Sequence, residues 1–176
     1  KLHMAFFHTI VKIANSVDGH VRSFNGDSAL IFFEGNLKAT LSKAVECGMK
    51  IKYAIDNSDL GINELLKKYS KLDFGIGIDH GEILCTKVGV GGEHNRDNFW
   101  IGNPVNKSTV LGDQSNKPNH VSISKYVYDN LLDSAKFGKS KDYLGNETDV
   151  DMWTQAIFNY NGENEYYYHT NWHWEI

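Results

Sequence analysis

A candidate metal ligand stands where a glycine turn meets an apolar segment: Asp27 follows Gly26 and precedes the run that ends at Phe33. A lone carboxylate beside a buried strand is expensive to desolvate unless a cation or hydrogen bonds compensate its charge. Because glycine permits a sharp turn, we expect Asp27 at the tip of a hairpin, with its oxygens aimed at one point. Such oxygens suit a hard divalent cation, and these cations usually accompany phosphates. The alternative is an ordinary turn, in which Gly-Asp pairs are common.

A second polar side chain, Asn106, follows Gly102 and Pro104 at the predicted start of a helix. Proline is permitted in the first turn of a helix, so this segment can open one. The amide of Asn106 would then point toward an open sheet edge. A helix-capping or surface role is the alternative.

The composition is that of one globular domain, and we treat residues 1–176 as a single unit with a sizeable core. The chain has 41% hydrophobic residues, 18 Lys and Arg, 22 Asp and Glu, and a net charge of −4. This balance argues against a general nucleic-acid binder, which carries a basic face. No apolar run approaches the roughly 20 residues of a membrane span, and no signal-peptide pattern is present. We therefore expect a cytoplasmic protein without membrane contact, whose Cys47 and Cys85 are reduced thiols.

Hydrophobic periodicity and turn residues predict an alternation of hairpins and helices. The expected elements are a helix over 2–17, strands over 20–25 and 29–33, a long helix over 37–55 with Asn36 as its N-cap, a short amphipathic segment over 62–69, strands over 72–78, 82–88 and 99–101, a helix over 103–111, a strand over 121–123, a helix from Ser124 to 132, and a closing hairpin of 152–160 and 165–174. Residues 136–149 are expected to form a polar loop.

This order indicates an α+β fold with helices on one face of the sheet. The chain opens on a helix, which in a split βαβ unit normally crosses back from an earlier strand. We therefore expect the natural protein to continue upstream with a first strand that this sequence lacks.

Three segments in this order resemble the catalytic domain of class III nucleotidyl cyclases. They are the Gly26-Asp27 hairpin, residues 74–81 (Phe-Gly-Ile-Gly-Ile-Asp-His-Gly), and residues 100–106 (Trp-Ile-Gly-Asn-Pro-Val-Asn). The resemblance covers roughly residues 6–132. It implies a ferredoxin-like α+β fold in which helices pack on a mostly antiparallel sheet.

The details are most similar to the Pycsar pyrimidine cyclases of bacterial anti-phage defence. Residues 22–27 (Arg-Ser-Phe-Asn-Gly-Asp), residues 99–106 and the tail segment Trp172-His173-Trp174 carry this closer resemblance.

The resemblance implies a reaction in which the ribose 3′-hydroxyl attacks the α-phosphate of a nucleoside triphosphate and pyrophosphate leaves. Two Mn²⁺ or Mg²⁺ ions are expected in each site. Asp27 matches the second of the two aspartates that hold the ions in this family, and the first belongs on the upstream strand. Asn106 matches the asparagine that orients the ribose.

The position four residues after Asn106 is a departure from the family, because Val110 stands where many relatives carry an arginine. A valine cannot neutralise phosphate charge. Arg22, Arg96 or Lys107 would have to replace it, although such residues are more often solvated surface charges.

The positions that read a purine base in related cyclases are also changed. They are occupied here by Ser23 and Phe99, which cannot reproduce the hydrogen bonds to adenine or guanine. A pyrimidine stacked on Phe24 or Phe99, with Arg22 as a donor, fits these residues better. The alternative for both phenylalanines is a place in the core.

We therefore expect a homodimeric cyclase that converts UTP or CTP to the 3′,5′-cyclic monophosphate, with UTP preferred on family frequency alone. Its product would activate a separate effector after phage infection. Asp27, Asn106 and Arg22 are the expected catalytic residues, and Arg22, Ser23, Phe24, Phe99 and Asn106 the expected nucleotide contacts. The alternatives are a purine cyclase with divergent base contacts and a cyclase-like module that binds nucleotide or dimerises without catalysis.

Overall fold

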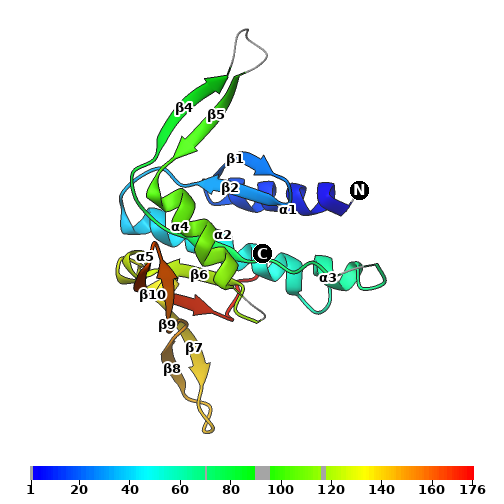
Figure 1. Cartoon of the computed structure of the whole chain (residues 1–176). Helices are drawn as coiled ribbons and strands as arrows, with labels where there is room; N and C mark the ends of the chain where they lie inside the picture. The colour runs from blue at the N-terminus through cyan, green and yellow to red at the C-terminus, as the bar shows by residue number, and fades with distance from the viewer. Residues whose placement is uncertain (1, 70, 90–95, 116–117) are drawn as a thin grey trace.

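The computed structural model describes residues 2–69, 71–89, 96–115 and 118–176 (Figure 1). Its helices are α1 (Leu2–Ser16), α2 (Lys38–Asp56), α3 (Ile62–Leu65), α4 (Asn103–Gln114), α5 (Lys125–Asp129) and α6 (Asp133–Lys136). Its strands are β1 (His20–Asn25), β2 (Ser28–Phe32), β3 (Ile76–Ile78), β4 (Leu84–Gly89), β5 (Arg96–Ile101), β6 (Val121–Ser124), β7 (Phe137–Lys141), β8 (Glu147–Asp151), β9 (Thr154–Tyr160) and β10 (Glu163–Thr170). Among the described helices, none has the length and apolar character that crossing a membrane requires.

The central sheet has the strand order β3-β6-β10-β9, in which only the β3–β6 pair is parallel. Side chains alternate along β3, so that its two isoleucines face α2. A Cβ atom on Gly48 of α2 would lie 3.3 Å from Ile76 and 3.4 Å from Ile78. Helix α2 therefore covers one face of this sheet.

Helix α4 covers the opposite face. A Cβ atom on Gly75 would lie 2.0 Å from the carbonyl oxygen of Gly112, and one on Gly77 would lie 1.8 Å from that of Ser108. The backbones of β3 and α4 are thus in direct contact, which only glycine allows. The expectation that all helices lie on one face of the sheet is wrong, because the glycines leave room for a helix on the second face.

Three apolar clusters hold these layers together. The first joins α2 to the sheet through Leu41, Val45, Met49, Val121, Ile123 and residues around α5 and α6. The second joins α1 to α2 through Ile10, Ile13, Ala14, Val17, Cys47, Ile51 and Ile55. The third joins α4 to the β9–β10 hairpin through Leu111, Phe158, Tyr160 and Tyr167. The predicted helix periodicities are confirmed by these buried faces.

The chain that leads into β3 is fixed by two polar side chains. Asn63 accepts the backbone N–H of Leu72 at 2.6 Å and donates to the Leu72 carbonyl at 3.0 Å. The ring of His120 stacks on Phe74 at 4.1 Å between centroids, and its Nδ1 lies 2.8 Å from the Phe74 carbonyl oxygen. These bonds hold the outer edge of the sheet in place.

The β4–β5 and β7–β8 hairpins project from opposite ends of the molecule (Figure 1). The predicted polar loop over residues 136–149 is wrong, because most of it forms the β7–β8 hairpin. Its strands lack an apolar alternation and are joined instead by polar pairs such as Lys139 with Asp149 at 2.6 Å. At the turn, the Asp142 carboxylate accepts the backbone N–H of Asn146 at 2.9 Å.

Helix boundaries differ from expectation where burial outweighs local capping. Asn36 is not the N-cap of α2, since the helix begins at Lys38 after Leu37 without a side-chain cap. Burial of Val45 and Met49 stabilises this helix without one. The closing hairpin is confirmed: its turn has φ angles of 53° at Asn161 and 85° at Gly162, as type I′ turns require.

We expect the substitution Gly77→Ala to lower the free energy of unfolding by about 3 kcal/mol, because the added methyl group collides with backbone rather than with a movable side chain. Urea denaturation of the purified protein measures this change. Gly112→Ala is the matched control on the facing helix. Its Cβ would meet nothing closer than 3.4 Å, so a change within about 1 kcal/mol is expected. Equal losses in the two variants would contradict the packing described.

Candidate active site

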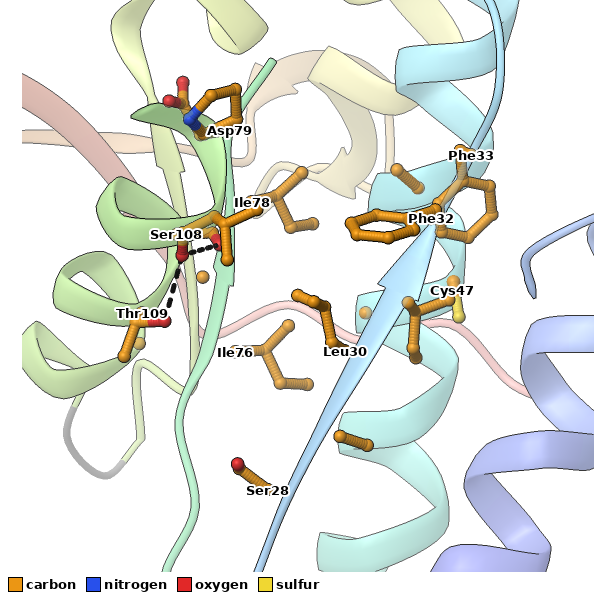
Figure 2. Close-up of a pocket in the computed structure, with 18 of the residues that line it drawn as sticks. Ser28, Leu30, Phe32, Phe33, Cys47, Ile76, Ile78, Asp79, Ser108 and Thr109 are labelled. Atoms are coloured by element: carbon orange, nitrogen blue, oxygen red, sulfur yellow. Dashed lines mark hydrogen bonds between the residues drawn. The ribbon is translucent and has the colours of Figure 1, made fainter. Parts of the chain in front are cut away.

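A cavity of about 1080 Å³ lies between β2 and β3, over α2. Figure 2 shows Leu30 and Phe32 of β2 on one side of it and Ile76 and Ile78 of β3 on the other, with Cys47 of α2 behind. Strand β2 pairs with β1 and strand β3 pairs with β6, and within the described residues no strand bonds the two edges that face the cavity. The cavity therefore separates two open strand edges by an apolar space.

Asp27 lies at the tip of the β1–β2 hairpin and lines the cavity at that end. The predicted turn is confirmed: Asn25 pairs with Ser28, and Gly26 has a φ of 63°. Ser28 closes the turn by donating its hydroxyl to the Asn25 carbonyl at 2.9 Å. Asp27 is exposed, and among the described residues none gives its carboxylate a hydrogen bond or an ion pair. Its oxygens are therefore available to an external cation.

The other candidates on β1 point in different directions. A bulge between Val21 and Ser23 makes Arg22 the extra residue, while Ser23 pairs with Leu30 and lines the cavity. Arg22 lies outside the cavity lining and forms an ion pair with Glu34 at 3.0 Å. The ring of Phe24 contacts that of Phe7 of α1, with 4.7 Å between centroids.

On β5, neighbouring aromatic residues face opposite ways. Trp100 turns inward and its ring lies 4.7 Å from that of Phe32, centroid to centroid. Phe99 is 57% exposed, and it lines the cavity. The structure thus brings Ser23, Phe99 and Asp27 to one cavity, and it directs Arg22 and Phe24 away from it.

Asn106 lies in the first turn of α4, exposed and outside the cavity lining. Val110 packs against the third apolar cluster, so the position of the arginine in related cyclases belongs to the core side of the helix. Lys107 forms an ion pair with Glu165, and its side chain is only 14% exposed. The side chain of Arg96 lies outside the described residues.

The polar residues of α4 that line the cavity were not singled out by sequence. Ser108 and Thr109 each donate a hydroxyl to the Val105 carbonyl at 3.0 Å (Figure 2). Their hydroxyl protons are used within the helix, so they offer a ligand acceptor oxygens rather than donors. Hydroxyl residues in a helix give no local signal that separates such a wall from an ordinary surface.

Within one chain, Asp27 and Asn106 lie at opposite ends of the β1–β2 hairpin. Strand β2 runs from Asp27 toward the start of α4 (Figure 1), and its last residue, Phe32, contacts Trp100 just before that helix. Five residues of strand span roughly 16 Å at about 3.3 Å each. One copy therefore does not bring the candidate metal ligand and the candidate ribose ligand together.

A complete metal site is not formed by one copy of the described chain, in which no three His, Cys, Asp or Glu side chains converge. Asp27 alone fits a hard divalent cation: its carboxylate has no partner among the described residues, and it lies at a hydrogen-bonded turn beside a cavity. Further oxygen ligands would have to come from a substrate or from another segment.

The thiol of Cys47 lies where the cavity borders the apolar cluster between α1 and α2. It is 2% exposed, and burial raises its pKa to about 12, with a further contribution from the nearby Glu46 carboxylate. At pH 8 only about one thiol in 10,000 would then be the reactive thiolate.

We expect iodoacetamide at pH 8 to alkylate the exposed Cys85 and leave Cys47 unmodified, as read by peptide mass spectrometry. Both should react in 6 M guanidinium; equal rates in the native protein would contradict the burial of Cys47.

Comparison with known proteins finds sequence similarity to uridylate cyclases and structural similarity to other nucleotide cyclases. No model of a known protein family matches it. It is 27% identical over 157 residues to a uridylate cyclase from Burkholderia cepacia, covering 84% of this chain and 65% of that protein. It is 26% identical to a uridylate cyclase from Xanthomonas perforans, covering 100% of this chain and 70% of that protein. The chain thus spans about two thirds of the length of these relatives.

Solved structures share the fold. The guanylyl cyclase Cya2 superposes with a TM-score of 0.72 at 16% identity, covering 96% of this chain and 78% of that one. The adenylyl cyclase CyaB from P. aeruginosa gives a TM-score of 0.67 at 19% identity, covering 96% of this chain and 80% of that one. The predicted class III cyclase fold is therefore confirmed, as is the sequence similarity to uridylate cyclases.

Proposed function

We propose that this chain, which has the class III cyclase fold and sequence similarity to uridylate cyclases, is the catalytic domain of a pyrimidine nucleotide cyclase. In the proposed reaction the ribose 3′-oxygen forms a bond to the α-phosphorus, and the proton of the 3′-hydroxyl leaves to solvent. The bond between the α-phosphorus and the oxygen that bridges the α- and β-phosphates breaks. The products are a 3′,5′-cyclic monophosphate and pyrophosphate. The exposed carboxylate of Asp27, which no residue in the described part of the chain pairs and which lies at a hairpin turn beside the cavity, is the observation that carries this proposal.

The proposed role of Asp27 is to hold a divalent ion, Mn²⁺ or Mg²⁺, against the triphosphate. Two such ions would supply neutralisation of the charge that develops on the attacking and leaving oxygens. The protein contributes position: the hairpin turn fixes the carboxylate, and α4 presents the amide of Asn106 to the ribose.

The other metal-binding aspartate, the partner of Asp27, is proposed to come from a strand that lies in the cavity. Strands β2 and β3 are connected through α2, and their facing edges leave backbone groups that an intervening strand would bond. A strand that precedes α1 and runs antiparallel to β2 would fill the apolar space above Cys47. An aspartate on that strand, beside the turn of β1 and β2, would complete the ion site with Asp27.

A pair of chains is proposed to form each site, because one copy separates Asp27 from Asn106. In a two-fold dimer, Asp27 of one protomer would face Asn106 of its partner, and the pairing would form two equivalent sites.

Selection of a pyrimidine is supported by the two side chains at the cavity that replace purine contacts. Ser23 and Phe99 both line the cavity; a serine hydroxyl and an apolar ring do not supply the hydrogen bonds that read a purine, and Phe99 offers a flat apolar face for stacking. The names of the relatives favour UTP over CTP. We propose that the cyclic product activates a separate effector in defence against phage.

A second candidate function is a nucleotide-binding or dimerisation module without catalysis. It is favoured by the absence of a free cation on the described part of α4 near Asn106, since Val110 is packed and Lys107 is paired.

We expect the full-length protein with Mn²⁺ to produce cyclic UMP when ATP, GTP, CTP and UTP are supplied in turn and products are identified by mass spectrometry. Asp27→Asn should lower kcat at least 100-fold, because the neutral amide cannot hold the ion. Asp149→Asn, in the distant β7–β8 hairpin, is the matched control and should keep full activity. Cyclic nucleotide synthesis that survives Asp27→Asn would exclude the proposed metal role.

Mixing two impaired variants tests the shared site. Asp27→Asn and Asn106→Ala should each keep at most about 1% of wild-type activity alone, whereas an equal mixture should recover about a quarter of it. Half of the randomly formed dimers would pair the two variants, and one of their two sites would carry both native residues. No recovery, with dimer exchange verified by a tag pull-down, would contradict a site shared between protomers.

A further inference from the structure

We infer that Tyr160 and Glu165 of the β9–β10 hairpin are positioning residues that hold the first turn of α4, and with it Asn106, in its working orientation. The inference rests on the proposed function for the role of Asn106. The restraint of the helix itself is inferred only from the contacts that Tyr160 and Glu165 make with α4.

The first contact is a hydrogen bond to the first residue of α4. The hydroxyl of Tyr160 donates to Oδ1 of Asn103 at 2.6 Å. Tyr160 is 8% exposed, so this hydroxyl has little access to water and depends on Asn103 for a partner.

The second contact lies one turn further along the helix. Lys107 forms an ion pair with Glu165, and its Nζ lies 5.4 Å from the centroid of the Tyr160 ring. The two side chains are 14% and 34% exposed, so solvent screens this pair less than a surface pair. Tyr160 therefore touches α4 twice, through its hydroxyl and through its ring.

These side-chain contacts restrain a first turn of α4 that has no side-chain cap. Its N-cap residue is Gly102, and no side chain caps the first turn. An uncapped first turn leaves backbone N–H groups without partners and frays readily. The hairpin supplies the missing restraint from outside the helix.

The geometry of the helix connects these contacts to Asn106. Successive residues are turned by about 100° around the axis, so Asn103, Lys107 and Val110 form one stripe that faces the hairpin. Asn106 is turned about 60° from Asn103, beside this stripe and exposed. A small rotation or loosening of the first turn would therefore displace the amide of Asn106, while the buried end of α4 at Leu111 stays packed.

The same contacts assign Lys107 a structural task. Its ammonium group is engaged by Glu165, which sets it apart from a free cation that could grip a triphosphate. The hairpin thus fixes the ribose-orienting residue and occupies the lysine that follows it.

Steady-state kinetics of the full-length protein with UTP and Mn²⁺ test the inference. We expect Tyr160→Phe, which removes only the hydroxyl, to lower kcat about 10-fold with KM for UTP changed less than twofold. Glu165→Ala should act similarly, and Glu165→Gln, which can still accept a hydrogen bond, should recover part of the loss. Tyr166→Phe is the matched control, since Tyr166 alternates to the other face of β10 and should keep full activity.

A double-mutant cycle separates positioning from a general structural effect. In the Asn106→Ala background, Tyr160→Phe should cause no further loss of residual kcat, because its effect passes through Asn106. Unchanged kcat in Tyr160→Phe, or an equal loss in both backgrounds, would overturn the inference.

Hydrogen exchange distinguishes failure of this inference from failure of the proposed function. The backbone amides of residues 105–107, which follow Pro104, should exchange at least fivefold faster in Tyr160→Phe than in wild type and Tyr166→Phe, with urea midpoints unchanged. If wild type makes no cyclic nucleotide, the proposed function fails, and the exchange result still decides whether the hairpin holds the helix. Equal exchange in all three proteins would overturn the inference whatever the activity.

Discussion

The arrangement depends on the contact between the backbones of β3 and α4, where Gly75 and Gly77 leave no side chain between strand and helix. This contact sets the height of α4 above the sheet. It brings Leu111 onto the β9–β10 hairpin and Asn103 within reach of Tyr160. One face of α4 packs on β3 and another packs on the β9–β10 hairpin, so the amide of Asn106 lies on the part of the helix that stays exposed.

The two ends of the β1–β2 hairpin have different environments. At the turn, Asp27 is exposed and unpaired among the described residues; at the other end, aromatic packing joins the hairpin to β5. The hairpin therefore has the exposed carboxylate of Asp27 at its turn, and the amide of Asn106 lies near its other end. Two-fold pairing is the simplest symmetry that brings such unlike ends together, because each surface then meets its complement twice.

Much of the fold could be predicted from sequence, because helix periodicity and turn residues act locally: the Gly26-Asp27 and Asn161-Gly162 hairpins and the helix over Leu2–Ser16 follow from nearby residues. The site was predictable only in part. Asp27, Ser23 and Phe99 share the cavity, whereas the direction of Arg22 depends on a bulge that has no sequence signature. Tyr160 and Glu165 lie 57 and 58 residues from the residues they contact on α4, and only the folded structure connects such distant positions.

The bulge in β1 has a consequence for how this strand can change in evolution. Because Arg22 is the additional residue, the pairing of Ser23 with Leu30 does not depend on it. An ordinary strand that gains or loses one residue turns every later side chain to the opposite face. Here a deletion at the bulge would leave the pairing of Ser23 with Leu30 in place, so length variation in β1 is uncoupled from the identity of the side chain that lines the cavity.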